Sequence, residues 1–251
     1  MEVLSCLEAA GSAFLAPLNG VAGWGDDGPV VLAACCYDTA LFDESLFGSL
    51  GLVQPEQLQR AVAKRKAEFL AGRYCARRAL ARLGLPDARI GIGGQRQPLW
   101  PGGVRGAISH TRQLAMAAVS RDASVCGVGV DVEEVLTPAA MVQIQPLVLN
   151  ADECDLLSRV RWPRESLVTL IYSIKESFFK AAFPLVQRYF DFDAISLLEI
   201  DTGEGECHFR INTALHPLLW QGRRLSGRFR FFHCAGLAAE NVATRVILAD
   251  R

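Results

Sequence analysis

The segment RESLVTLIYSIKESFFKAAF, residues 164–183, predicts the clearest helix of the chain. Its large apolar residues recur at helical spacing: Leu167, Ile171, Ile174 and Phe178. Residues at i, i+4, i+7 and i+11 share one side of an α-helix, so this stripe should pack against a core. Pro184 follows directly and is expected to end the helix.

Outside this helix the sequence predicts mostly short strands. Downstream segments alternate between apolar and polar residues, with Gly-containing turns between them, which is typical of antiparallel strands. These segments are FDAISLLEI (192–200), ECHFRIN (206–212), GRFRFFHC (227–234) and TRVILA (244–249). Upstream strands are expected at VVLAACCY (30–37), AISHT (107–111), LAMAAVS (114–120) and VCGVGVDVEEV (125–135).

Further helices are expected before residue 164. One should run from Gln54 to about Leu83, where Gly84 closes it, and residues 138–163 should form helices with a break. Helices combined with mainly antiparallel strands define an α+β fold. A seam near residues 121–126 divides the 251 residues into halves of similar size, so we expect two domains, 1–125 and 126–251.

Composition excludes several classes of protein. Hydrophobic residues make up 51% of the chain and the net charge is −1, which favours a packed core and argues against a broad nucleic-acid-binding surface. The eight cysteines form no C-x-x-C pair, and no apolar run is long enough to cross a membrane. Residues 1–20 contain Glu2 and Glu8 and have no basic n-region, so they do not resemble a signal peptide. We therefore expect a cytoplasmic protein.

Two acids interrupt an otherwise apolar predicted strand. Asp131 and Glu133 of GVGVDVEE (127–134) are two residues apart, so they project from the same side of that strand. Neighbouring carboxylates repel each other and resist burial unless a cation or a basic group joins them. One interpretation is a strand end that reaches solvent, and the other is a cation site.

The helix at 164–183 carries a second stripe that is polar. Thr169, Ser173, Glu176 and Lys180 follow the same spacing as the apolar stripe, offset by two residues. This stripe is either an ordinary solvated face with a weak Glu–Lys pair or part of a site. Asp131, Glu133 and Glu176 together would be a suitable oxygen-donor set for Mg²⁺.

The first half of the sequence also contains polar residues with two possible interpretations. His110 lies in ISHT between two predicted strands, where it is either a satisfied turn residue or, with Ser109, a donor to phosphate. Lys64, Arg65 and Arg73 lie on or just before the first long helix, where they form either a solvated basic face or a phosphate clamp.

Four segments in order resemble the 4′-phosphopantetheinyl transferases. GVGVDVEE and YSIKESFFKAAFP (172–184) are similar to the signature strand G-(V/I)-D-x-E and helix (W/F/Y)-(S/A)-x-K-E-(A/S)-x-x-K. KRKAEFLAGRYCARRAL (64–80) and QPLWPGG…GAISHT (97–111) resemble two further blocks. Those blocks belong to the subgroup of enterobactin-type synthetase components and the broad-specificity transferase of pseudomonads.

The resemblance implies a fold and a set of roles. It implies a monomer of two similar α+β halves related by a pseudo-twofold axis, with coenzyme A in the cleft between them. By position, the metal ligands would be Asp131, Glu133 and Glu176, and Lys180 would contact phosphate. The remaining coenzyme A-binding residues would be Ser109 and His110 at the diphosphate, Lys64, Arg65 and Arg73 near the 3′-phosphate, and Arg96. Arg96 stands in Arg96-Gln97-Pro98, where many relatives carry Gly-Lys-Pro.

The implied reaction is the Mg²⁺-dependent transfer of 4′-phosphopantetheine from coenzyme A to a serine of an apo acyl or peptidyl carrier protein, with release of 3′,5′-ADP. Glu176, directly or through a water, would be the base, and Lys180 and His110 would stabilise the developing charge. The carrier could belong to fatty-acid, siderophore or polyketide synthesis. Two other functions stay open: a Mg²⁺-dependent phosphohydrolase that uses the same acids, and a non-catalytic coenzyme A-binding protein.

Overall fold

The structure is a computed structural model that describes residues 13–18, 28–234 and 236–250. The chain divides into two compact units, Met1–Ala123 and Ser124–Arg251. Both combine helices with antiparallel sheet, so the predicted α+β class is confirmed. The prediction that residues 1–20 are not a signal peptide concerns residues that lie mostly outside the described part.

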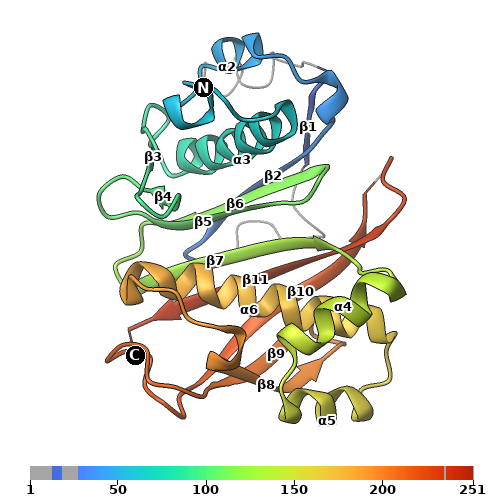
Figure 1. Cartoon of the computed structure of the whole chain (residues 1–251). Helices are drawn as coiled ribbons and strands as arrows, with labels where there is room; N and C mark the ends of the chain where they lie inside the picture. The colour runs from blue at the N-terminus through green and yellow to red at the C-terminus, as the bar shows by residue number, and fades with distance from the viewer. Residues whose placement is uncertain (1–12, 19–27, 235, 251) are drawn as a thin grey trace. The chain divides into compact units, whose positions relative to one another are not determined.

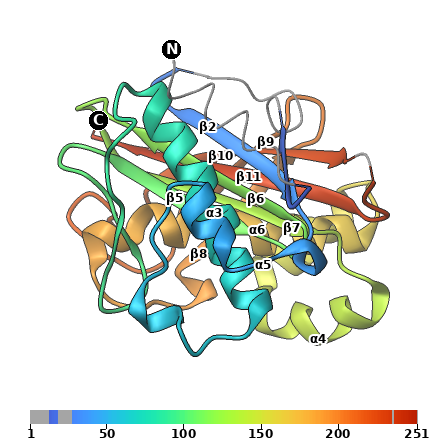
Figure 2. The ribbon, with the colours of Figure 1, turned by 90° about the horizontal axis from the view of Figure 1, so that it is seen from above.

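Unit 1 packs one long helix on a four-stranded antiparallel sheet. The sheet order is β1-β2-β6-β5, with every neighbouring pair antiparallel, and a separate two-stranded ribbon joins β3 to β4. The strands are β1 (Leu15–Leu18), β2 (Val31–Tyr37), β3 (Gly91–Ile92), β4 (Pro98–Leu99), β5 (Arg105–His110) and β6 (Leu114–Ser120). The helical segments are η1 (Thr39–Leu41), α2 (Ser45–Ser49), η2 (Glu56–Leu58) and α3 (Ala63–Arg82). Figure 2 shows α3 lying across this sheet.

Unit 2 contains a five-stranded antiparallel sheet in the order β7-β11-β10-β9-β8. Its strands are β7 (Val125–Glu134), β8 (Ile195–Asp201), β9 (Glu206–Ile211), β10 (Arg224–His233) and β11 (Glu240–Ala249). Its helical segments are α4 (Pro138–Val148), α5 (Ala151–Arg159), α6 (Arg164–Val186) and η3 (Phe192–Ala194). The long helix α6 runs along β7 and β11, whereas α5 packs on β8 (Figure 1).

The apolar stripe of α6 lies in the core of unit 2, as its spacing predicts. Leu167, Ile171, Ile174 and Phe178 are each at most 1% exposed. They pack in one cluster with residues from all parts of the sheet, including Phe209 of β9 and Val246 of β11. Burial of side chains of this size is the main contribution to the stability of such a unit.

Helix α3 begins later than predicted. The residues from Gln54 to Val62 form the short turn η2 and an extended link, and the helix starts at Ala63. Val62 adopts an extended conformation at the N-cap and is 72% exposed, so it does not belong to the apolar face. Residues 56–62 contain no Gly or Pro, which permits a helix but does not require one, because an extra helical turn without core contacts gains little stability.

Helix α6 extends past Pro184, which the sequence predicted to be its end. It continues to Val186 and is closed by Gln187, which has the left-handed φ of 53° and donates its N–H to Phe183. A proline removes one backbone donor and crowds the preceding turn, but it does not prevent the remaining residues from keeping helical angles. Tertiary packing of Phe183, which is 8% exposed, holds this last turn in place.

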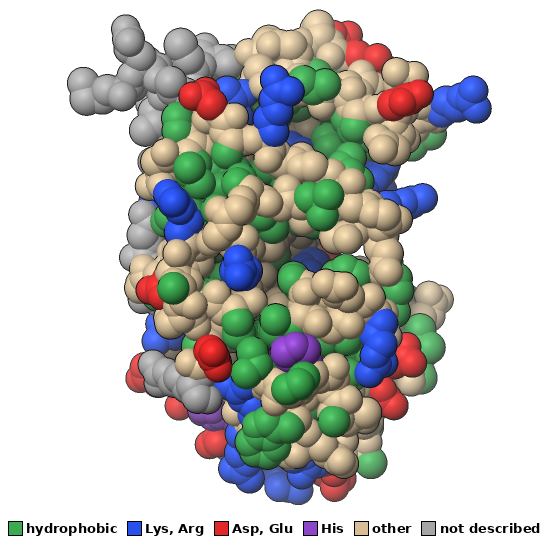
Figure 3. All heavy atoms as spheres, turned by 90° about the vertical axis from the view of Figure 1, so that its left-hand side faces the viewer, with side chains coloured by type: hydrophobic (Ala, Val, Ile, Leu, Met, Phe, Trp, Pro, Cys, Tyr) green, Lys and Arg blue, Asp and Glu red, His purple; other side chains and the backbone are tan. Residues whose placement is uncertain are grey.

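Surface features agree with the modest charge of the chain. On the face drawn in Figure 3, the Lys and Arg side chains of the described residues are dispersed among acidic and apolar ones. Within the described part of the chain, no helix is both long enough and apolar enough to cross a bilayer.

Candidate active site

The acids of β7 face α6, because two glycines let the helix approach the strand closely. Gly127, Gly129 and Asp131 are two residues apart and therefore point to the same side of β7. A Cβ built on Gly129 would lie 1.8 Å from the backbone oxygen of Ser177 in α6. A side chain at this position cannot coexist with the observed packing. The motif G-V-G-V-D thus brings Asp131 directly against the polar stripe of α6.

Asp131 is 2% exposed and is bound on both carboxylate oxygens by residues of α6. Lys180 Nζ donates to Oδ1 at 2.6 Å, and Ser173 Oγ donates to Oδ2 at 2.8 Å. Lys180 keeps 23% of its side chain exposed, so its ammonium group lies at the boundary between this buried carboxylate and solvent. The predicted polar stripe is therefore not a solvated helix face.

Buried hydroxyl groups extend this arrangement to β11. Thr244, the cross-strand neighbour of Asp131, is fully buried, and its Oγ1 lies 2.8 Å from Ser173 Oγ and 2.7 Å from Ser177 Oγ. The hydroxyl of Thr244 also points at the backbone oxygen of Ser173 at 2.9 Å. These contacts fix the orientation of the Asp131 carboxylate.

The surrounding carboxyl groups hold their protons unusually tightly. Burial, followed by the charge of Asp131, raises the pKa of Glu133 to about 8, although Lys180 opposes the shift. Burial also raises the pKa of Glu176, again against the effect of Lys180. Tyr172, which the sequence did not single out, has a raised pKa because of burial and of the nearby charges of Glu176 and Glu133. Lys180 alone does not balance this set of acids.

In the described part of the chain, no three His, Cys, Asp or Glu side chains form a group that could hold a metal ion. Asp131 is paired with Lys180, and both affect the pKa values of Glu133 and Glu176. The structure brings the predicted acids into one electrostatic group, and their role as metal ligands stays a prediction.

A pocket of about 300 Å³ opens beside Glu176. Its walls come from α6 and from the segment that leads to β8, and most of them are apolar. The lining residues are Lys175, Glu176, Phe178, Phe179, Tyr189, Phe190, Asp191, Phe192, Ala194 and Ile195. Sequence reasoning missed this pocket, although the aromatic run Tyr189-Phe190-Asp191-Phe192 after Pro184 was a signal for it.

In unit 1, the predicted phosphate-binding residues fall into two groups. Arg65 NH1 lies 3.2 Å from His110 Nε2, so this nitrogen accepts and the ring proton is on Nδ1 when the imidazole is neutral. Ser109 is buried next to His110 on β5. Lys64 and Arg65 keep 60% and 45% of their side chains exposed and both pair with Glu68. These cations are accessible to a ligand.

Arg73 and Arg96 differ from that group. Arg73 is 7% exposed, and its guanidinium donates to the backbone oxygens of Ile90 and Gly91 at 3.2 and 3.0 Å. Burial lowers its pKa to about 10. Arg73 therefore anchors β3 to α3 in this structure. Arg96 is exposed in the turn between β3 and β4, where it has a positive φ of 65°.

Comparison with known proteins adds to this picture. The family model described as "4′-phosphopantetheinyl transferase N-terminal domain" matches residues 54–120. The model described as "4′-phosphopantetheinyl transferase superfamily" matches residues 127–234, which include β7 and α6. The acids, the lysine and the glycines described above all lie within these matched segments.

Several curated proteins are similar to this chain. The 4′-phosphopantetheinyl transferase PptT of Mycobacterium tuberculosis is 34% identical over 183 residues, which cover 68% of this chain and 77% of PptT. The transferase Svp of Streptomyces mobaraensis is 35% identical over 186 residues, covering 71% and 72%. Enterobactin synthase component D of Salmonella typhi is 41% identical over 143 residues, covering 56% of this chain and 59% of that protein.

The chain is thus an α+β protein in which Lys180 lies among three acids where strand β7 packs against helix α6. The chain belongs to the 4′-phosphopantetheinyl transferase superfamily.

Proposed function

We propose that this protein transfers 4′-phosphopantetheine from coenzyme A to a serine of an apo carrier protein and releases 3′,5′-ADP. The observation that carries the proposal is the contact of β7 with α6, where Asp131 binds Lys180 in the company of Glu133 and Glu176. Such a site combines a proton acceptor, Glu176, with a cation, Lys180, that can bind a phosphate. Family membership and the names of the relatives support this activity.

The donor set suits Mg²⁺. Carboxylate oxygens are the ligands that Mg²⁺ prefers. Burial, with a smaller contribution from the charge of Asp131, raises the pKa of Glu133 and of Glu176, and a bound divalent cation would favour the ionised form of both groups. Asp131, Glu133 and Glu176 would hold the ion. When bound, Mg²⁺ would supply Lewis-acid stabilisation to the diphosphate of coenzyme A.

The chain's own residues would move the proton and stabilise charge. Glu176 would accept the proton of the carrier serine, directly or through a water. Lys180, whose ammonium group is partly exposed, would stabilise negative charge on the leaving 3′,5′-ADP. We assign Ser109 and His110 of unit 1 to the diphosphate as hydrogen-bond donors.

The remaining parts of coenzyme A have matching surfaces. The apolar pocket beside Glu176 suits the pantetheine arm, which is a narrow chain of methylene and amide groups. Lys64 and Arg65 are exposed and suit the 3′-phosphate. Arg96 is a further exposed cation that could contact a phosphate. Arg73 is buried and would support the site only indirectly, by holding β3 in place.

A surface of unit 2 suits the carrier protein. Helix α4 exposes Val142 and Leu147 by 67% and 72%. Arg164, at the start of α6, donates from Nε and NH2 to Gln145 of α4 at 3.2 and 3.1 Å. Arg159 and Arg161 are also exposed. An acidic carrier would meet both apolar contacts and cations on this surface.

Intact-mass spectrometry of the carrier tests the proposal. The protein is incubated with coenzyme A, Mg²⁺ and apo carriers of siderophore, fatty-acid and polyketide synthesis. The enterobactin synthase relatives make a siderophore carrier the first choice. We expect one phosphopantetheine added to the carrier and an equal amount of 3′,5′-ADP. Free phosphopantetheine with an unmodified carrier would indicate a phosphohydrolase, and coenzyme A binding without either product would indicate a binding protein.

A further inference from the structure

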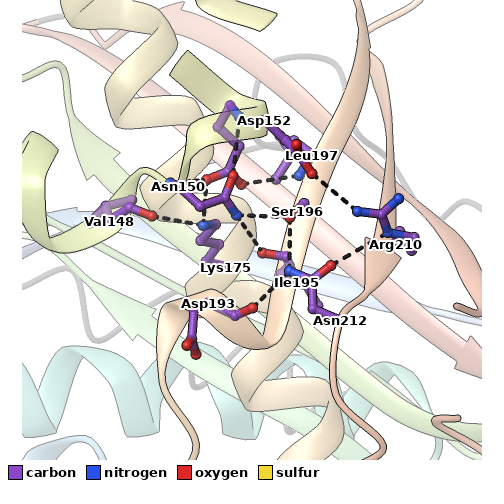
Figure 4. Close-up of polar contacts among 11 residues, drawn as sticks. Val148, Asn150, Asp152, Lys175, Asp193, Ile195, Ser196, Leu197, Arg210 and Asn212 are labelled. Carbon is purple, nitrogen blue, oxygen red and sulfur yellow. Dashed lines mark hydrogen bonds and ion pairs between the residues drawn. The ribbon is translucent and has the colours of Figure 1, made fainter. Parts of the chain in front are cut away.

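A buried lysine lies next to Glu176 in sequence but points into the protein. The side chain of Lys175 is 1% exposed, and its Nζ donates to Glu153 Oε2 and to the backbone oxygen of Val148, each at 2.7 Å. In Figure 4, a dashed line joins Lys175 to Val148. The reaction proposed above gives Lys175 no role.

Its partner Glu153 is also fully buried and is bound by three donors. Besides Lys175, the backbone N–H of Leu197 donates to Oε1 and that of Asn150 donates to Oε2, both at 3.0 Å. Asn150 and Glu153 form a capping box at the start of α5. The ion pair therefore ties the middle of α6 to the end of α4, the start of α5 and the strand β8.

A second set of contacts stiffens this junction. The side-chain nitrogens of Asn150 and Asn212 both donate to Ser196 Oγ at 2.8 Å (Figure 4). At the outer edge, Arg210 pairs with Asp152 at 3.1 Å, where their side chains are 42% and 57% exposed. The network thus changes from a fully buried ion pair at Lys175 to a solvated one at its rim.

A gain in stability does not by itself explain the buried ion pair of Lys175 and Glu153. Removing two charges from water costs free energy that their attraction only partly returns, and an apolar pair of similar volume often stabilises a fold as well or better. What the pair supplies is a fixed position, because Lys175 must reach two acceptors on other segments. Successive residues of an α-helix point about 100° apart, so fixing Lys175 also fixes the direction of Glu176.

We infer that Lys175 and Glu153 are positioning residues, which set the rotation of α6 and thereby hold the Glu176 carboxylate at the mouth of its pocket. Both Lys175 and Glu176 line that pocket, so a small rotation of α6 would move Glu176 relative to Asp131 and Lys180. The inference rests on the proposed function for its kinetic test, but its geometric content concerns the chain alone.

A double-mutant cycle with Glu176 separates positioning from general stability. Lys175→Met should lower kcat by about 10- to 100-fold, the range typical of residues that orient a reacting group, with little change in KM for coenzyme A. The same substitution in a Glu176→Gln background should cost less than about 3-fold, because Lys175 acts through Glu176. An equal loss in both backgrounds would overturn the inference.

Two controls bracket the result. Asp152→Asn breaks only the exposed rim pair and should leave kcat unchanged. Phe229→Leu weakens the core of unit 2 away from the pocket and should lower the thermal midpoint without the selective loss of kcat. If Lys175→Met does not fold, the double variant Lys175→Met/Glu153→Gln replaces it, since removing both charges is tolerated better than leaving one unpaired. Recovery of full kcat in the folded double variant would overturn the inference.

Crystal structures of the wild type and of Lys175→Met test the positioning role without measuring the reaction. Failure of the wild type to modify any carrier would contradict the proposed function, but the position of Glu176 would still be measurable. We expect its carboxylate to shift by more than about 0.5 Å relative to Asp131, the tolerance of a functional constellation. Superposition within that limit would overturn the positioning role.

Discussion

Asp131 shows how much of this site depends on single side chains. Its two oxygens are held by Lys180 and Ser173, so the carboxylate is oriented by the fold itself. We expect Asp131→Asn to abolish carrier modification, because the replacement is neutral and the cation-binding charge is lost. The free energy of unfolding should change by no more than about 1–2 kcal/mol. Lys180 is partly exposed, and the substitution removes the repulsion between residue 131 and Glu133. A variant that still modifies the carrier at wild-type rate would contradict the assignment.

Lys180 is the side chain that distinguishes a catalytic site from a cluster of acids. If its ammonium group meets charge that develops in the transition state, Lys180→Ala should lower kcat by about 10²-fold or more. Lys180→Arg should also be impaired, because a planar fork does not replace a point charge in contact with Asp131. Single-turnover rates with a saturating carrier measure both effects. Turnover close to that of the wild type in Lys180→Ala would assign this lysine to Asp131 alone.

Glu133 makes stability depend on pH. Its pKa in the folded protein is about 8, above the ordinary value of 4.5, so the folded state binds the proton more tightly than the unfolded state. The resulting stability is fully present below pH 4.5 and is lost as the pH rises through 8. In a chelating buffer, the thermal midpoint of the wild type should fall between pH 5 and pH 9, and Glu133→Gln should reduce that fall.

Glu199→Gln is the matched control for this prediction. Glu199 is exposed on β8, away from the acids of β7. The thermal midpoint of Glu199→Gln should therefore fall with pH as steeply as that of the wild type. If the thermal midpoints of Glu133→Gln and the wild type fall equally between pH 5 and pH 9, Glu133 does not titrate in this range.

At the scale of elements, the contact between β7 and α6 is the decisive one. Gly129→Ala would place a Cβ 1.8 Å from the backbone oxygen of Ser177, and neither backbone can move without displacing the site. We expect a loss of about 3 kcal/mol or more in the free energy of unfolding, at the upper end of overpacking effects, together with loss of activity. Denaturant titration measures the first and carrier modification the second.

Gly203→Ala provides the comparison within the same unit. A Cβ at Gly203 would approach only the side chain of Asp201, at 3.4 Å, so its effect should stay below about 1 kcal/mol. Similar losses in both variants would show that α6 does not need the close approach to β7.

At the scale of the whole molecule, both units should contribute to the use of coenzyme A. If Lys64 and Arg65 of unit 1 grip the 3′-phosphate, coenzyme A should be preferred over dephospho-coenzyme A by about 10- to 100-fold in affinity, from roughly 1.5–3 kcal/mol of charge-assisted hydrogen bonding. Lys64→Ala or Arg65→Ala should erase this preference and leave kcat nearly unchanged. His110→Ala should instead lower kcat with both cofactors. Equal use of the two cofactors by the wild type would contradict the assignment.

The sequence by itself determined the elements that have a strong period. The apolar stripe of α6, the alternation of the strands and the α+β class were predictable, because periodic burial leaves its mark directly in the order of residues. It also predicted a metal site of Asp131, Glu133 and Glu176, which stays a prediction, whereas the ion pair of Asp131 with Lys180 and its hydrogen bond from Ser173 were not predicted. The start of α3 and the continuation of α6 past Pro184 were not predictable, because local sequence permitted both outcomes.

Only the tertiary structure decided what the individual polar residues do. It turned Arg73 inward onto β3, left Lys64 and Arg65 exposed, and buried Lys175 against Glu153, although all four are cations on helices. The physical reason is that the cost of burying a charge depends on partners from distant segments, which a single stretch of sequence does not contain. The apolar pocket beside Glu176 likewise exists only because the chain after α6 folds back over that helix.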